Sequence, residues 1–430
     1  MSREKQQNYL VPIIMMILLF GMISFVTNLA APMGVVLKNQ FGVSNAAGLL
    51  GNMANFIAYA VMGIPGGILL QRVGYKKTAL IAIAVGFLGV FIQFLSGHAS
   101  QSSAFAVYLL GAFIAGFSMC LLNTVVNPML NTLGGGGNKG NQLIQTGGAF
   151  NSVMATFTPA FVGILIGETA KAQITNVFPV MYIAMGVFAL VFVVLWLVSI
   201  PEPQAERFAE PIGTLMSGAL KFRHFILGAV AIFAYVGVEV GTPAMANLWL
   251  SESTMYGAVI GGSVAMTYWF LMFIGRLTGA SIGSKVSSKT MLSVMSAIAL
   301  ILIGLAIFSP ATTQVNLPLF QRSDAGAISF SLTQVPINAM FIMLVGLCTS
   351  IMWGSIYNLA VEGLGKYLAV ASGIFMTLVC GGGILPWIQG LVADATGYLP
   401  SYWVMFAGFA YLLYYAVIGS KNVNKDIPVD

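Results

Sequence analysis

The sequence is poor in charged residues, in histidine and in cysteine. Only 7% of its 430 residues are charged, and it has 2 histidines and 3 cysteines. A typical soluble domain carries roughly 25% charged residues, so these charges cannot cover the surface of a water-soluble protein of this length. The cysteines lie in apolar stretches without paired spacing, and no metal motif is present. The composition excludes a secreted disulfide scaffold, a cytosolic enzyme and a disordered chain, and we expect no metal site and no nucleic-acid partner.

Apolar segments fill the sequence instead, since 58% of the residues are hydrophobic. A membrane-spanning helix needs about 20 mostly apolar residues. Twelve stretches of this kind can be marked, at 10–37, 46–70, 78–96, 104–130, 141–167, 178–200, 225–250, 256–280, 289–308, 332–359, 367–391 and 401–419. The pattern predicts an all-α membrane protein with twelve transmembrane helices in two pseudo-symmetric halves, residues 1–200 and 224–430, joined by a cytoplasmic linker at 201–223.

The basic residues predict the orientation of these helices. When the loops are assigned alternately to two sides, 15 of the 18 Lys and Arg residues fall on the side that holds both termini. Cytoplasmic loops carry such an excess of Lys and Arg. We therefore expect a multi-pass protein of a bacterial inner membrane with both termini in the cytoplasm.

Several motifs resemble those of a known transporter superfamily. The loop after the second apolar stretch reads Arg72-Val-Gly74-Tyr75-Lys76-Lys77, as in the first hairpin of major facilitator transporters. Other motifs are Thr124-x-x-Asn127-Pro128, Phe150-Asn151-Ser152, Tyr235-Val236-Gly237-x-Glu239, Gly275-Arg276, Gly381-Gly382-Gly383 and Asp394-Ala-Thr-Gly397. In their order along the chain they are similar to the fucose/galactose/glucose:proton symporter family. The resemblance implies the major facilitator fold and transport of a sugar by alternating access.

The basic loop motif is a candidate conformational latch. A glycine turn lets two helices reverse tightly while basic side chains bind the carbonyl groups at helix ends. We assign this role to Arg72, Gly74 and Lys76, and to Arg276 in the second half. The alternative is that these residues only form ordinary cytoplasmic loops.

Glu239 is an acidic residue in an unusual position for a membrane protein. The other eleven acids lie in loops, at helix ends or in the tails, whereas Glu239 lies in the middle of the apolar run from Phe225 to Leu250. A carboxyl group at that depth is costly unless it faces a cavity or a partner, so it is a candidate for proton coupling. The alternative is a permanently protonated side chain that only bonds a neighbouring helix.

The resemblance implies two further carboxylates, in the first and fourth helices. The matching positions hold Ala31 and Asn123. Either Glu239 alone couples transport to protons, or the protein is an uncoupled facilitator.

Buried amides and one aromatic residue are candidates for sugar binding. Amides both donate and accept hydrogen bonds, as sugar hydroxyls require, and aromatic faces stack on C–H surfaces. The resemblance places an aromatic residue at Trp353. The predicted substrate-binding residues are Asn28, Asn123, Asn127, Gln145, Asn151, Trp353 and Asn358. The alternative for each amide is a bond that holds two helices together.

Together these features predict a secondary transporter that imports a neutral sugar or sugar derivative. We expect no cofactor, protons as the coupling ion, a sugar and the lipid bilayer as partners, and a monomer. An uncoupled sugar facilitator and a carrier of peptidoglycan-derived amino sugars remain alternatives. An intramembrane enzyme would need convergent catalytic groups, and a sensor would need a soluble output domain; the sequence indicates neither. The identity of the sugar, the direction and the stoichiometry stay open.

Overall fold

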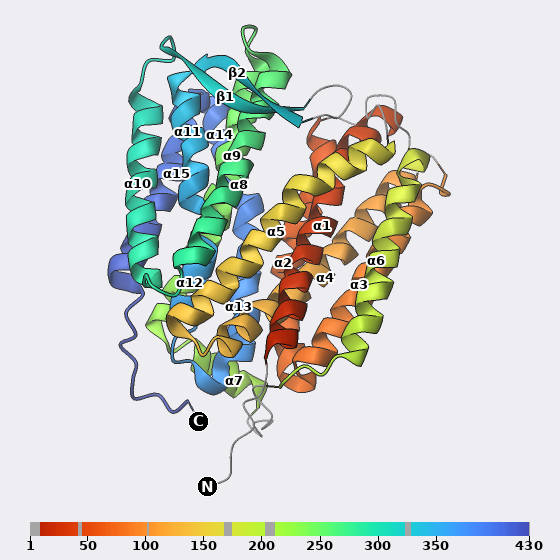
Figure 1. The fold of residues 1–430 in the computed structure, drawn as a ribbon, viewed down its shortest axis with the longest axis vertical. Coiled ribbons are helices and arrows are strands. Elements are labelled where there is room, and N and C mark those ends of the chain that lie inside the picture. Colours follow the sequence, from red (N-terminus) through yellow and green to blue (C-terminus); the bar gives the residue numbers. More distant parts are fainter. Residues whose placement is uncertain are drawn as a thin grey trace.

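The structure is a computed structural model that describes residues 9–41, 45–100, 103–166, 174–202, 211–322 and 328–429. The first half of the chain forms six long helices, which we call the N-terminal half (Figure 1). They are α1 (Leu10–Phe41), α2 (Asn45–Val73), α3 (Tyr75–Ser96), α4 (Ala104–Leu133), α5 (Gly137–Ile166) and α6 (Phe178–Leu197), with a short 3-10 turn at Ile174–Val177 before α6.

A short helix, α7 (Ile212–Ala219), leads into the C-terminal half. This half contains α8 (Arg223–Glu252), α9 (Gly257–Ile282), α10 (Ser288–Phe308), α11 (Ile337–Thr349), α12 (Met352–Ala360), α13 (Leu368–Thr377), α14 (Gly381–Thr396) and α15 (Tyr398–Tyr414). Short 3-10 turns at Gly365–Tyr367 and Leu378–Cys380 flank α13, and α15 continues as a π-helical turn at Tyr415–Gly419.

Each of the twelve predicted spans corresponds to a helix or a pair of helices in the structure. Within the described residues, 10 helices are long and apolar enough to cross a membrane, with α13 and α14 forming one of these spans. The pair α11 and α12, bent by 41°, forms an eleventh. The twelfth is α5, which is 30 residues long and polar in its first turns.

Two sides of the molecule can be distinguished in Figure 1. We call the side that carries α7 and the C-terminal residues the linker side. The opposite side carries a β-hairpin, and we call it the hairpin side.

The β-hairpin is a departure from the predicted helix pattern. Strands β1 (Gln314–Arg322) and β2 (Ile328–Pro336) pair antiparallel. Their side chains alternate between two faces, and one face buries Leu319 and Val335 completely. The rings of Phe320 and Phe330 lie 5.1 Å and 5.4 Å from Phe270 of α9. The span expected to begin at residue 332 therefore begins at Ile337, because the preceding apolar residues belong to a strand.

The two halves approach closely where α2 crosses α13 near the linker side. A Cβ atom on Gly67 would lie 2.8 Å from Gly373 Cα, and one on Gly373 would lie 2.6 Å from the backbone oxygen of Gly63. Such distances leave no room for any side chain at the crossing. Small residues allow this approach of helix backbones within a membrane, and here they close the linker side.

Candidate functional site

Glu239 lies in a buried ion pair inside the C-terminal half. Its Oε1 atom is 3.0 Å from Arg276 Nη2 of α9, and the two side chains are 11% and 13% exposed. The hydroxyl of Tyr235 donates to the same oxygen at 2.8 Å, and that of Tyr268 donates to the Glu239 backbone oxygen at 3.2 Å. Tyr235 and Glu239 share a face of α8 because they are four residues apart. The structure therefore gives the isolated acid of the sequence a cationic partner.

Arg276 also reaches across to the N-terminal half. Its Nη1 atom donates to Ser152 Oγ at 2.7 Å, to the Gly148 backbone oxygen at 3.3 Å and to Asn151 Oδ1 at 3.4 Å, all in α5. Arg276 was expected near the cytoplasmic end of its span. It lies inside α9, which continues for six further residues to Ile282, and its side chain is turned toward the interior. The sequence indicates Arg276 only as a candidate latch residue and does not indicate its pairing with Glu239, because an arginine close to a span end resembles a loop residue.

A chain of amide and aromatic groups lies beside this ion pair. Asn123 donates to the Tyr59 hydroxyl at 2.6 Å, and Asn127 donates to the Asn123 backbone oxygen at 2.8 Å. Trp353 of α12 donates from Nε1 to Asn127 Oδ1 at 3.0 Å and so joins the two halves. The ring of Tyr235, which bonds Glu239, lies 6.2 Å from the Trp353 ring in an edge contact. Three predicted sugar-binding residues therefore meet in one cluster next to the predicted proton site.

Three other predicted sugar-binding residues hold helices together in this structure. Gln145 donates to the Ile351 backbone oxygen of the C-terminal half at 2.7 Å. Asn358 accepts from Asn131 at 2.7 Å and donates to Ser288 Oγ at 2.9 Å. Asn151 donates to the Phe20 backbone oxygen at 2.9 Å, in addition to accepting from Arg276. The side chain of Asn28, the seventh predicted residue, lies outside the described part of the chain.

The sequence reasoning missed Asn131 as a partner of Asn358. Asn131 lies in the last turn of α4, where a polar residue resembles the edge of a loop. Its place on the same helix as Asn123 and Asn127, at a spacing of four, is the signal that could have found it.

A comparison with protein-family models shows the family of the chain. The model described as Major Facilitator Superfamily matches residues 13–386. The chain belongs to the Major Facilitator Superfamily. It is 28% identical over 431 residues to a protein named glucose/galactose transporter from Brucella abortus, covering 97% of this chain and 96% of the relative. It is 23% identical over 424 residues to the L-fucose-proton symporter of Escherichia coli, covering 92% and 90%.

The fold of this Major Facilitator Superfamily protein matches a solved structure. The crystal structure of the E. coli fucose:proton symporter superimposes with a TM-score of 0.81 at 19% identity, over 97% of this chain and all of that one. The likeness confirms the twelve-helix fold. Membership in this superfamily makes the protein a membrane transporter rather than an enzyme.

The basic loop of this superfamily protein ties the turn between α2 and α3 to α6. Gly74 has a positive φ of 85°, and Glu202 accepts from the backbone nitrogens of Tyr75 at 2.7 Å and Lys76 at 3.0 Å. Lys76 Nζ donates to the Trp196 backbone oxygen at the end of α6, at 2.8 Å. The carboxylate and the ammonium therefore bind the helix ends that their charges favour.

These contacts join the N-terminal half to Glu202 at the start of the linker, and the Arg72 side chain is exposed. Glu202 was missed because it looks like an ordinary linker residue.

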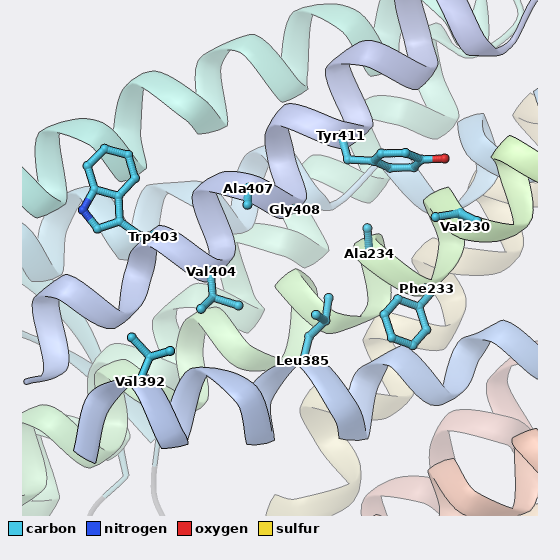
Figure 2. Close-up of a pocket in the computed structure, with 10 residues that line it drawn as sticks. All are labelled: Val230, Phe233, Ala234, Leu385, Val392, Trp403, Val404, Ala407, Gly408 and Tyr411. Atoms are coloured by element: carbon cyan, nitrogen blue, oxygen red, sulfur yellow. The ribbon is translucent and has the colours of Figure 1, made fainter. Parts of the chain in front are cut away.

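The transporter also has an apolar cavity of about 500 Å³ in its C-terminal half (Figure 2). Its lining comes from α8, α14 and α15 and consists of Val230, Phe233, Ala234, Leu385, Val392, Trp403, Val404, Ala407, Gly408 and Tyr411. The Tyr411 hydroxyl donates to the Leu227 backbone oxygen. A sugar needs many hydrogen-bond partners, so this lining does not suit one. Among the described residues, no group of three or more His, Cys, Asp or Glu side chains is placed to hold a metal ion.

Proposed function

We propose that this transporter imports a neutral monosaccharide together with protons across a bacterial inner membrane. The observation that carries the proposal is the buried pair of Glu239 and Arg276 beside the neutral cluster of Trp353, Asn127 and Asn123. The names of the relatives, a glucose/galactose transporter and an L-fucose-proton symporter, support the same substrate class and coupling ion.

The neutral cluster is the proposed sugar site. Its amides and indole can donate to and accept from hydroxyl groups, while the rings of Trp353 and Tyr235 offer apolar faces. In the present structure Trp353 Nε1 and Asn127 Oδ1 satisfy each other. The hydroxyls of a sugar between the halves would replace this bond, so the indole and the amide would stay hydrogen-bonded when the sugar binds. We assign Gln145, Asn151, Asn358 and Asn28 to the path beside this centre.

Glu239 is the proposed proton carrier. It bonds groups of its own half on one side and, through Arg276, faces the N-terminal half on the other. The halves at 1–200 and 224–430 would rock about the segment at 201–223, with the linker side and both termini in the cytoplasm, and a single chain would be the transporting unit. This is the alternating access of proteins built from two repeats.

The test is uptake into proteoliposomes that contain the purified protein. The panel is radiolabelled glucose, galactose, L-fucose and N-acetylglucosamine, each with and without an inward proton gradient. We expect accumulation of at least one neutral hexose above its external concentration only when the gradient is present. Equal uptake with and without the gradient, without accumulation, would instead establish an uncoupled facilitator. Preference for N-acetylglucosamine would establish an amino-sugar carrier.

A further inference from the structure

The guanidinium group of Arg276 makes two sets of contacts with its two terminal nitrogens. Nη2 pairs with Glu239 in the same half, and Nη1 donates to Ser152, Gly148 and Asn151 in the opposite half. The group is planar and rigid, so movement at one nitrogen moves the other.

We propose that Arg276 transmits the protonation state of Glu239 to the contact between the two halves on the linker side. The proposal rests on the proposed function, in which Glu239 exchanges a proton. It adds the residue through which that proton would change the conformation.

The charges around the pair give the direction of this effect. The groups that face Glu239 from α8 and α9 are Arg276, the Tyr235 hydroxyl and, at the backbone, the Tyr268 hydroxyl. With Glu239 ionised, the pair is neutral and suits a closed, buried interface. With Glu239 protonated, Arg276 is a buried cation whose remaining partners in α5 are uncharged. An unpaired buried charge strongly favours any state in which water reaches it.

Separation of α5 from α9 on the linker side would bring water to Arg276. Gln142 of α5 donates to the Ala280 backbone oxygen of α9 at 3.1 Å, one turn beyond Arg276 toward the linker side, so this contact would open first. Protonation of Glu239 therefore favours the open linker side, and loss of the proton favours the closed one. With the linker side in the cytoplasm, a proton that binds from outside would be released inside.

The experiment measures the distance between the halves by pulsed electron paramagnetic resonance in nanodiscs. Spin labels are placed at Lys139→Cys, in the first turn of α5, and at Lys285→Cys, beyond the end of α9; both lysines are exposed. The half-buried Cys380 is replaced by Ser, and the buried Cys120 and Cys348 are kept. In this background we expect the ratio of open to closed linker side to rise roughly tenfold from alkaline to acidic pH, within the usual range of coupling between sites.

Variants of the two residues form a thermodynamic cycle. Glu239→Gln should stay open-shifted at every pH. Arg276→Gln should lose the opening at acidic pH, because no buried cation is left; any opening that its unpaired Glu239 carboxylate causes at alkaline pH would have the opposite sign. The double variant should return to the closed distribution, because it has no unpaired charge. Arg276→Lys should keep part of the pH response, since it keeps the charge but not the fork of donors. A full pH response in Arg276→Gln, or a double variant as open as Glu239→Gln, would overturn the proposal.

Ser152→Ala tests the same link in a chain that keeps the ion pair. It removes the shortest bond from Arg276 to α5, so the open population at alkaline pH should rise and the pH response should shrink. An unchanged response would count against the link even if Arg276→Gln does not fold.

Sugar accumulation is measured in parallel. If Glu239→Gln still accumulates sugar, the proposed function fails. If accumulation needs Glu239 but the spin-label distances do not change with pH, only the proposed role of Arg276 fails.

Discussion

The indole of Trp353 and the amide of Asn127 join the two halves of the transporter through one hydrogen bond, from Nε1 to Oδ1 at 3.0 Å. Asn127 also donates to the Asn123 side chain at 3.3 Å, so the bond continues into a chain of amides on α4. The two amides are buried and the indole is partly buried, so the amides need partners whether or not a sugar is bound. The binding of a sugar that replaced these bonds would therefore depend directly on the distance between the halves.

Replacement of Trp353 by Phe should weaken sugar binding without disturbing the fold. The variant keeps an aromatic face and loses the indole donor, which leaves Asn127 Oδ1 without that partner. We expect the Kd of the transported sugar to rise roughly tenfold, or about 1.4 kcal/mol. The Kd is measured in detergent, by tryptophan fluorescence or by the ligand-induced shift of the melting temperature. The matched control is Trp403→Phe, at the apolar cavity of α15, and equal effects of the two variants would remove Trp353 from the sugar site.

Replacement of Glu239 by Gln should separate accumulation from exchange. The amide keeps the shape of the side chain and its bond with Tyr235 but cannot carry a proton. We expect loss of gradient-driven accumulation, while counterflow of labelled sugar against unlabelled sugar continues. Glu362→Gln changes an exposed acid of the same half and should accumulate sugar like the wild type. Accumulation by Glu239→Gln at the wild-type level would contradict the coupling role.

Much of the fold could be predicted because the membrane imposes it. A span needs a long apolar run, and twelve such runs are visible without any knowledge of their contacts. The hairpin escaped because its leucines and valines alternate with polar residues over too short a stretch to stand out beside the helices. Pro318 in β1 further weakens the strand pattern, since proline removes a ladder donor.

The site could be predicted only in part. Glu239 stood out because an acid in the middle of a span is costly, a property that belongs to one residue. Its pairing with Arg276 depends on how α8 packs on α9, and the contact of Arg276 with Ser152 depends on how the halves meet. Neither contact can be predicted from the spacing of residues along the sequence. The amides gave the right residue types, but which of them face a partner helix is decided by packing.

Replacement of Asn358 by Ala should act on closure more than on binding. Asn358 accepts from Asn131 of the opposite half and donates to Ser288. The variant leaves Asn131 unpaired in the closed state, and water can satisfy it only when the linker side opens. We expect a loss of about 1 to 2 kcal/mol from the closed state, with less than a threefold change in sugar Kd. Spin-label distances and binding are measured on the same sample; a tenfold loss of binding with unchanged distances would return Asn358 to the sugar site.

Replacement of Gly373 by Ala should prevent the linker side from closing. The new methyl group would lie 2.6 Å from both the Gly67 Cα atom and the Gly63 backbone oxygen, which are parts of a helix backbone and cannot rotate away. The halves would have to separate at this crossing, at a cost of about 1 to 3 kcal/mol to the closed state. We expect slower transport and a longer distance between spin labels at Lys139→Cys and Lys285→Cys. Gly390→Ala, at an open position on the same span, is the control, because it adds the same methyl group where nothing lies within 4 Å. If both variants transport at the wild-type rate, the crossing of α2 and α13 does not limit closure.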